Sequence, residues 1–307
     1  MSAVSTGHAS SPKGGGALRR ARKRLKHLVA RLDTITLGAL EATRRSSLLG
    51  DGDAVVSLTS YGVRIDAVHT TIESIGRGVV RPRRIILWLD DADALERSTP
   101  QLRRLQRRGL EMHLADNLGP HTKYWPYVES TPDRSVPLVT ADDDIIYPRR
   151  WLADLLEAGR TRPDTIHCYW ARVVRLDDDG RFAPYGSWPS ASDTAPSPAN
   201  FALGVSGVLY PPRMLDALHG AGRAFETVTP KADDIWLHAI ALRAGVPVAQ
   251  VRDKAVHFLT VPGTQVISLR ADNVAGTGND DAIDRVYGPE DRAVLTGIDR
   301  GARRTGT

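Results

Sequence analysis

The chain has 307 residues, of which 41% are hydrophobic and 25% charged, a composition that supports a packed core and excludes a disordered or fibrous protein. Its formal charge of +5 is unevenly spread, because residues 1–50 hold ten Lys or Arg against only Asp33 and Glu41. That segment carries +8 and the rest of the chain carries −3, so the basic character belongs to the leader rather than to the body.

The single cysteine, Cys168, excludes an intrachain disulfide and any metal site built from cysteines. It predicts a reducing, cytoplasmic location. The N-terminal segment contains no apolar stretch long enough for a signal peptide or a membrane-spanning helix. Any work on lipid-linked material is therefore expected at the inner face of the membrane, with the protein attached peripherally.

The leader divides into two parts. Residues 1–16 are rich in Ser and Gly and are predicted to form a disordered tail, whereas residues 17–50 are predicted to be a basic amphipathic helical leader. Its apolar stripe consists of Leu18, Ala21, Leu25, Leu28, Leu32 and Ile35. Three interpretations of the stripe stay open: contact of residues 17–35 with an anionic membrane, packing on the body, or pairing with a second copy. Nucleic acid is not expected as a partner, because no aromatic residues interleave the basic ones.

Residues 51–269 show short apolar runs alternating with helical segments. This rhythm predicts one α/β domain with a Rossmann-like, mixed and mostly parallel sheet flanked by helices. The predicted strands are 54–58, 84–89, 110–114, 136–140, 165–176 and 201–212, and the predicted helices are 66–75, 100–108, 148–158 and an amphipathic helix at 233–244. Residues 270–307 are polar and Gly-rich and are predicted to be a loosely held C-terminal tail.

Three consecutive carboxylates, Asp142, Asp143 and Asp144, follow the fourth predicted strand. Like charges at the mouth of a buried strand are costly unless a cation offsets them, and α/β sheets bind ligands beyond the carboxyl ends of their strands. Mg²⁺ and Mn²⁺ take one or two carboxylates together with a substrate's phosphates. The motif therefore predicts a metal-bridged diphosphate site, and its plainer alternative is an acidic turn. A second acidic run, Asp177–Asp179 before Gly180, is predicted to be an exposed hairpin turn.

Six motifs carry a family resemblance. They are Ser57-Leu-Thr-Ser-Tyr-Gly-Val-Arg64, Ile85-Ile-Leu-Trp-Leu89, Leu118-Gly-Pro-His-Thr-Lys-Tyr124, Ala141-Asp-Asp-Asp-Ile-Ile-Tyr-Pro148, Gly204-Val-Ser-Gly-Val-Leu-Tyr-Pro211 and Ala232-Asp-Asp-Ile-Trp236. In this order they resemble nucleotide-sugar glycosyltransferases of the GT-A fold, and most closely the bacterial polysaccharide-type enzymes whose metal motif is a triple Asp. The resemblance spans roughly residues 53–260.

On the donor side, the resemblance implies a divalent ion, Mn²⁺ or Mg²⁺, that grips the diphosphate of a UDP- or GDP-sugar. Its implied ligands are Asp142, Asp144 and His257. The residues implied to bind the nucleotide are Thr59, Ser60, Tyr61, Arg64, Lys123, Asp142 and Asp143. Gly62 would let the backbone approach the nucleotide closely.

On the acceptor side, the resemblance implies a carboxylate at the start of the late helix as the general base of an inverting reaction. Asp234 is assigned this role, and Asp233 is expected to cap the helix. Gly204–Gly207 would form the floor of the acceptor site, and Trp188 and Trp236 would stack on sugar rings unless they belong to the core.

The predicted function is a metal-dependent, inverting transfer of a sugar from a nucleotide donor to a glycan or lipid-linked acceptor. One alternative is a sugar nucleotidyltransferase, which uses a related sheet and similar metal chemistry. Another is a non-enzymatic membrane-surface or scaffolding protein with a degenerate acidic site.

Overall fold

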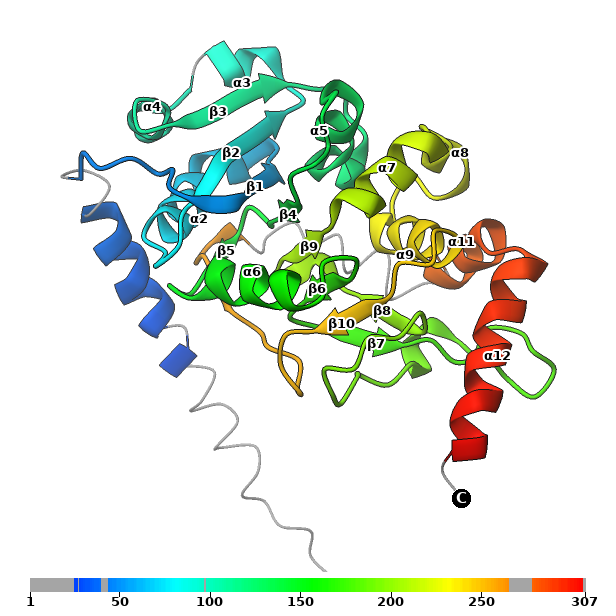
Figure 1. The fold of residues 1–307 in the computed structure, drawn as a ribbon. Coiled ribbons are helices and arrows are strands. Elements are labelled where there is room, and N and C mark those ends of the chain that lie inside the picture. Colours follow the sequence, from blue (N-terminus) through cyan, green and yellow to red (C-terminus); the bar gives the residue numbers. More distant parts are fainter. Residues whose placement is uncertain (1–24, 27, 40–43, 97, 265–277, 306–307) are drawn as a thin grey trace, which may run out of the picture.

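A seven-stranded sheet with the order β10-β6-β9-β4-β1-β2-β3 forms the centre of the molecule (Figure 1). The computed structural model describes residues 25–26, 28–39, 44–96, 98–264 and 278–305, with side chains as far as residue 298. The sheet strands are β1 (Gly52–Thr59), β2 (Pro82–Leu89), β3 (Leu110–Leu114), β4 (Leu138–Thr140), β6 (Ile166–Cys168), β9 (Val208–Tyr210) and β10 (Val248–Gln250). Only β9 among them is antiparallel to its neighbours, so the predicted mixed, mostly parallel sheet is confirmed.

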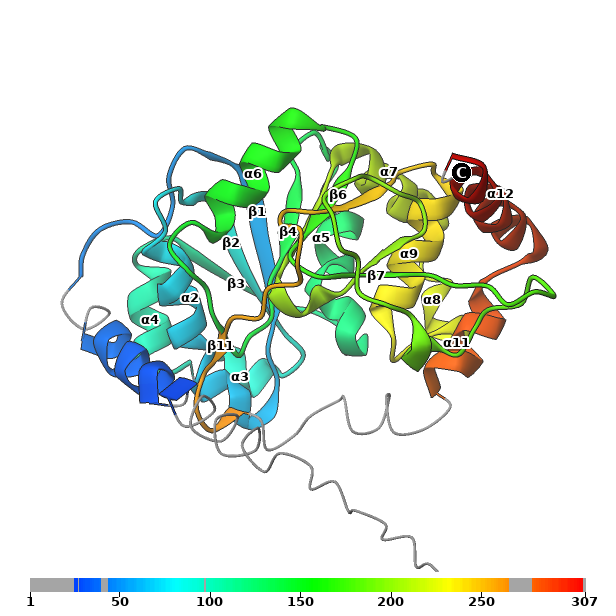
Figure 2. The ribbon, with the colours of Figure 1, turned by 90° about the horizontal axis from the view of Figure 1, so that it is seen from below.

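Helices cover both faces of this sheet (Figure 2). One face carries α2 (Val68–Gly76), α4 (Pro100–Gln106) and α6 (Trp151–Thr161), and the other carries α5 (Trp125–Ser130), α7 (Pro212–Ala221), α9 (Asp233–Arg243) and α11 (Gly278–Val286). Successive strand residues point to opposite faces, so Val55 enters one core and Val56 the other. Burial on both faces explains why β1 is a nearly continuous apolar run in the sequence.

The remaining elements are short or peripheral. Two ribbons pair β5 (Ile145–Ile146) with β11 (Leu259–Thr260) and β7 (Ala171–Val173) with β8 (Asn200–Ala202). Further helices are α3 (Ala92–Glu96), α8 (Phe225–Val228) and α12 (Pro289–Thr305). The described residues also contain the 3-10 turns η1 (Gly62–Asp66), η2 (Gly119–Lys123), η3 (Tyr185–Ser187) and η4 (Gly204–Ser206).

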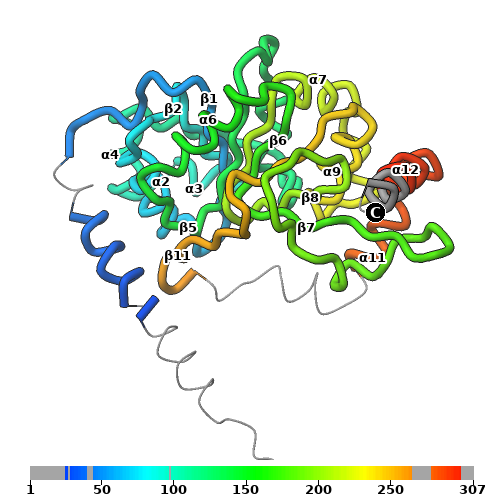
Figure 3. Tube along the Cα trace, turned by 60° about the horizontal axis from the view of Figure 1, so that its bottom comes forward, coloured from blue at the N-terminus to red at the C-terminus, as the bar shows by residue number. Residues whose placement is uncertain are grey.

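A helix over residues 28–39 lies at the side of the body, beside α2 and the β5–β11 ribbon (Figure 3). Its Ala30 and Leu37 pack against Ile146 and Val261. The described members of the predicted stripe, Leu25, Leu28, Leu32 and Ile35, are exposed instead. The interpretation in which this stripe packs on the body is therefore wrong for those four residues. Leu18, Ala21 and the tail predicted at residues 1–16 lie outside the described residues.

The strands and helices predicted as far as residue 158 are present, with ends displaced by a few residues. The acidic run Asp177–Asp179 forms the predicted turn, in which Gly180 has φ +75° and Leu176 and Phe182 form an antiparallel bridge. Two later predictions are wrong. Residues 165–176 divide into β6 and β7, and residues 201–212 divide into β8, η4 and β9, because the chain leaves one sheet for another in each segment.

The expectation of a loose tail over residues 270–307 is wrong for its described part. Residues 278–305 form α11 and α12, which place Ile283, Val286 and Leu295 in the core against α9. Helix α9 is therefore buried on nearly all sides instead of presenting one apolar stripe, because α7 packs on it from one direction and α11 and α12 from another. None of the helices within the described residues combines the length and apolar character needed to cross a bilayer.

Candidate active site

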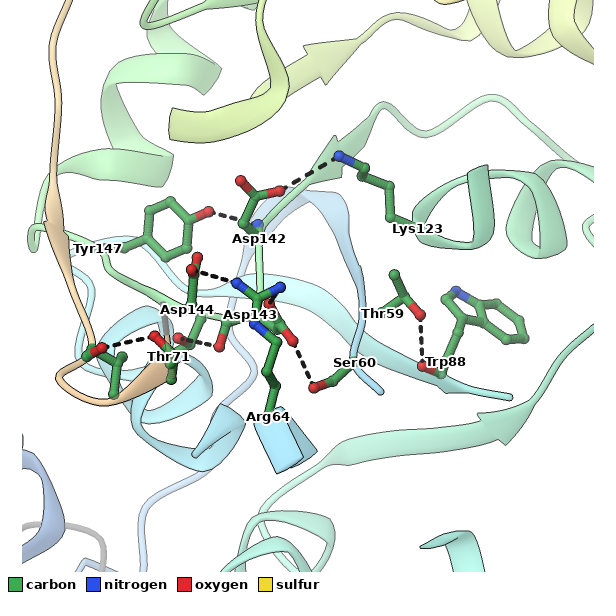
Figure 4. A network of polar contacts seen from close by, with 12 residues as sticks. Thr59, Ser60, Arg64, Thr71, Trp88, Lys123, Asp142, Asp143, Asp144 and Tyr147 are labelled. Atoms are coloured by element: carbon green, nitrogen blue, oxygen red, sulfur yellow. Dashed lines mark hydrogen bonds and ion pairs between the residues drawn. The ribbon is translucent and has the colours of Figure 1, made fainter. Parts of the chain in front are cut away.

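Polar side chains gather where β1 and β4 end and where η2 passes them (Figure 4). β1 leads into Thr59 and Ser60, and the parallel strand β4 leads into Asp142. η2 brings Lys123 to the same edge, since the Ser57 hydroxyl donates to the Lys123 carbonyl at 2.7 Å. Thr59, Ser60, Lys123 and Asp142 therefore lie at one edge of the sheet.

Asp143 and Asp144 are held by Arg64 from η1. The Arg64 Nη1 atom lies 3.1 Å from Asp143 Oδ1, and Nη2 lies 2.5 Å from Asp144 Oδ2. Ser60 donates its hydroxyl to the other Asp143 oxygen at 2.7 Å. Burial raises the pKa of Asp143 to about 6, although Arg64 and Ser60 act in the opposite direction. A guanidinium thus offsets the carboxylate charge for which the sequence predicts a metal ion.

The Arg64 guanidinium retains one donor without a partner. Its Nε is buried and has no hydrogen-bond acceptor among the described residues. A buried donor without a partner costs about 1–3 kcal/mol, so a ligand oxygen at this point would be stabilising. The site therefore contains, within the described part of the chain, one buried arginine donor without an acceptor beside the acidic run.

Lys123 joins the first half of the fold to α9. Its ammonium lies 3.5 Å from Asp142 Oδ1 and 3.1 Å from Asp233 Oδ2. Burial alone would lower the pKa of Lys123, but the carboxylates of Asp233, Asp142 and Asp234 together hold that pKa well above its usual value. Burial also raises the pKa of Asp142, against the effect of Lys123. Lys123 therefore stays cationic within an acidic group whose members, Asp142, Asp233 and Asp234, span 93 positions of the sequence.

Asp234 faces η4. Its Oδ1 accepts the Gly204 N–H at 3.2 Å, and a Cβ at Gly204 would lie 3.2 Å from the same oxygen and 3.1 Å from Lys123 Nζ. Burial, reinforced by Asp233, raises the pKa of Asp234 to about 8 in spite of Lys123. A carboxyl group with a pKa near neutrality is suited to general-base work. The expected capping by Asp233 is wrong, because no side chain caps α9 and Asp233 contacts Lys123 instead.

Several supporting residues were not recognised in the sequence. The Tyr147 hydroxyl accepts the Asp142 N–H at 2.9 Å, and the Thr71 hydroxyl donates to the Asp143 carbonyl at 3.0 Å. The Ser57 hydroxyl, which holds η2, accepts from Trp88 Nε1 at 2.9 Å. The available signal was Ser57 itself, a polar residue inside the apolar run of β1 that needs a partner once buried.

The residues predicted to bind the nucleotide at the end of β1 differ in their contacts and exposure. The Thr59 hydroxyl donates to the Trp88 carbonyl at 3.1 Å. Tyr61 is half-buried at the start of η1, so its ring is partly accessible, and Gly62 has φ +55°. Positive φ is easy for glycine, so Gly62 permits the turn that brings Arg64 back toward the aspartates.

Other predicted residues contact aromatic rings or lie inside the core. His257 is exposed and its ring lies 4.3 Å from that of Trp170. Trp188 and Trp236 are buried in the main core, as their alternative interpretation expected. His121 is also buried, with Nδ1 2.8 Å from the Tyr124 hydroxyl and Nε2 2.8 Å from the Thr229 carbonyl. Burial lowers the pKa of His121, which therefore acts as a neutral support for η2.

The carboxylates have the right chemistry for Mg²⁺ or Mn²⁺, and in the structure cationic side chains lie beside them. Across the part of the chain that the structure describes, no three His, Cys, Asp or Glu side chains converge on a point that would hold an ion. Asp144, one predicted ligand, is bound to Arg64, and Asp142 lies beside Lys123. The ligand set of Asp142, Asp144 and His257 stays a prediction.

Comparison with known proteins gives similarity to solved structures only. No family model and no curated protein matches the chain. Residues 1–349 of TarS from S. aureus match at 12% identity and a TM-score of 0.43, with 66% of this chain and 59% of that chain covered. This chain thus spans less than two thirds of the matched TarS chain. The same TarS fragment in complex with UDP matches at 12% identity over the same shares, with a TM-score of 0.42. The 4-diphosphocytidyl-2C-methyl-D-erythritol synthase from Anaerococcus prevotii DSM 20548 matches at 15% identity and a TM-score of 0.44, over 76% of this chain and 97% of that chain.

Proposed function

We propose that this protein is an inverting glycosyltransferase that moves a sugar from a nucleoside-diphosphate donor to a hydroxyl group of a glycan or lipid-linked acceptor. The observation that carries the proposal is the contact of Lys123 with both Asp142 and Asp233. This contact brings two carboxylates of α9 to the strand ends where an α/β fold binds nucleotides. A donor-side carboxylate and the start of α9, which carries the candidate base Asp234, thereby lie at one ammonium.

In the proposed reaction, the acceptor oxygen forms a bond to the anomeric carbon of the donor sugar. The bond from that carbon to the diphosphate oxygen breaks, and its electron pair leaves with the nucleoside diphosphate. Asp234 takes the proton of the acceptor hydroxyl. Its Oδ1 is held by Gly204 N–H, so we assign the proton to Oδ2. Inversion follows because the acceptor attacks from the side opposite the leaving group.

The residues proposed for the donor are those at the ends of β1 and β4. Arg64 would attract the phosphates by its charge, and Lys123 would offset charge on the departing diphosphate. Thr59, Ser60 and Tyr61 would lie along the nucleotide, with Asp142 and Asp143 beside it. Mn²⁺ or Mg²⁺ remains the proposed ion because carboxylate oxygens suit these ions. The bond formation and proton transfer of the proposed reaction do not depend on it.

Nucleotide binding is tested by thermal shift with UDP and GDP, each with and without Mn²⁺. We expect one nucleotide to raise the melting temperature of the wild-type protein, and Asp144→Ala to abolish the metal-dependent part of that rise. Asp178→Ala provides a matched control, because it removes one carboxylate from the other acidic run, at an exposed turn. Absence of stabilisation by any nucleotide in the wild-type protein would refute the proposal.

Product analysis separates the two transferase classes. A glycosyltransferase releases a nucleoside diphosphate from a nucleotide sugar, whereas a nucleotidyltransferase releases pyrophosphate from a nucleoside triphosphate and a sugar phosphate. We expect nucleoside diphosphate release that stops in Asp234→Asn. Pyrophosphate release by the wild-type protein would instead establish the nucleotidyltransferase alternative.

A further inference from the structure

The helix of residues 28–39 has two apolar faces, and only one of them is covered. Ala30 and Leu37 are buried against Ile146 and Val261. Leu25, Leu28, Leu32 and Ile35 are between 55 and 69% exposed, and Val29 adds to them at 40%. At 100° per residue these five side chains fall within about a 120° sector opposite the buried pair. The helix is therefore fixed to the body by its smaller face, with its larger apolar face pointing outward.

The charge of this segment indicates what covers the outward face. Lys26 and Arg31 are exposed near the stripe, and the sequence just before it adds five basic residues between positions 19 and 24. Asp33 is the only acidic residue between positions 17 and 40. An apolar stripe flanked by cations matches the boundary between anionic headgroups and acyl chains, where apolar burial and electrostatic attraction add together. A second copy of the same helix would bring the cationic flanks together, which opposes pairing.

The attachment point of the helix relates this face to the candidate active site. Ile146 follows the acidic run by two residues, and Val261 donates its N–H to the Asp144 carbonyl at 2.7 Å. The helix thus packs on the same ribbon that holds Asp144. The helix that carries the stripe therefore lies beside the ribbon that follows the aspartates.

We propose that residues 25–39 form an in-plane anchor that lays Leu25, Leu28, Leu32 and Ile35 into an anionic lipid bilayer. The anchor holds the β5–β11 ribbon, and with it Asp142–Asp144, close to the headgroups. On the proposed function, this geometry selects acceptors whose reacting hydroxyl sits at the membrane surface, such as lipid-linked glycans. The membrane contact itself depends only on the helix.

Vesicle flotation of the full chain tests the anchor. We expect the wild-type protein to float with vesicles of phosphatidylglycerol and phosphatidylcholine, to bind pure phosphatidylcholine vesicles much less, and to be released by salt. The variant Leu28→Gln/Leu32→Gln/Ile35→Gln should lose at least about tenfold in partitioning to the anionic vesicles. The matched control Val79→Gln/Leu114→Gln/Val294→Gln removes three other apolar side chains that are 47–52% exposed and should bind like the wild type.

A second variant, Lys26→Glu/Arg31→Glu, changes only exposed charges and should weaken binding to anionic vesicles while leaving the melting temperature unchanged. Equal binding by the wild type and the glutamine stripe variant would overturn the proposal. So would a concentration-dependent dimer in light scattering that the stripe variant abolishes, without vesicle binding by the wild type. Stabilisation by nucleotides in the stripe variant is a separate readout, so failure of the anchor and failure of the proposed function are distinguishable.

Discussion

The ammonium nitrogen of Lys123 lies 3.1 Å from a carboxylate oxygen of Asp233, which joins η2 to the start of α9. This ion pair is mostly buried, and it places the neighbouring residue, Asp234, against Gly204. The acidic start of α9 is consequently part of the same site as the acidic end of β4.

Asp234→Asn should lower kcat by about 10²–10⁴-fold, because a positioned general base contributes a factor of that size. The amide keeps an oxygen that can accept the Gly204 N–H, so the fold and the nucleotide affinity should change little. Steady-state kinetics and nucleotide titration measure the two quantities separately. A variant that keeps normal turnover would remove Asp234 from the reaction.

Activity should rise with pH as Asp234 loses its proton. Its pKa is raised to about 8 by burial and by Asp233, so the basic form accumulates as the pH passes through that value. The profile of kcat/KM should therefore show an ascending limb with an apparent pKa near 8. A profile that is flat between pH 6 and pH 9 would contradict the assignment.

The same pKa makes the folded protein less stable as the pH rises. An Asp in the unfolded chain releases its proton near pH 4, whereas folded Asp234 releases it near pH 8, so the unfolded state binds fewer protons between these values. The free energy of unfolding should fall across that window, by at most about 1.4 kcal/mol per pH unit from this group, and should level off above it. Denaturant unfolding between pH 5 and pH 9 measures the slope. Asp234→Asn should show a shallower decline between pH 6 and pH 8.

Arg64→Met should reduce stability by about 3–5 kcal/mol at neutral pH, because it leaves the buried carboxylates of Asp143 and Asp144 without their cation. Arg64→Lys retains the charge but cannot reach both carboxylates with a planar fork, so a smaller loss is expected. Urea denaturation of the wild type and the two variants measures these losses of stability. The Met variant should also lose nucleotide stabilisation, and unchanged stability would show that the ion pairs contribute nothing.

Gly207→Ala should cost about 2 kcal/mol or more. Gly207 has φ +90°, and an added methyl group would lie 2.7 Å from the Trp151 indole, which in turn donates to the Ser206 carbonyl. Gly186→Ala is the matched control, because Gly186 has no atom within 4 Å of an added Cβ and no positive φ. Thermal melting of the two variants tests the difference. Equal losses would show that the crowding at Trp151 is relieved without cost.

The sequence predicted best the positions of those site residues that directly follow a strand. Thr59, Ser60 and Asp142 lie together because β1 and β4 are parallel neighbours, and the carboxyl ends of parallel strands share one edge. The partner of the triple Asp was not predicted, because nothing in the sequence shows that η1 turns Arg64 back onto residues 79 and 80 positions later. The position of His257 was not predictable for a similar reason, since it depends on the path of the chain between β10 and β11.

By itself, the sequence determined the strand and helix rhythm, the α/β class, the hairpin at Asp177–Gly180 and the sheet edge that carries the polar groups. These features follow from apolar periodicity and turn residues, which act over a few positions. Only the tertiary structure decided which cation neutralises each aspartate, that the C-terminal helices cover α9, and which face of the leader helix is covered. Those outcomes depend on contacts between segments far apart in the chain, where burial and charge pairing override local preference.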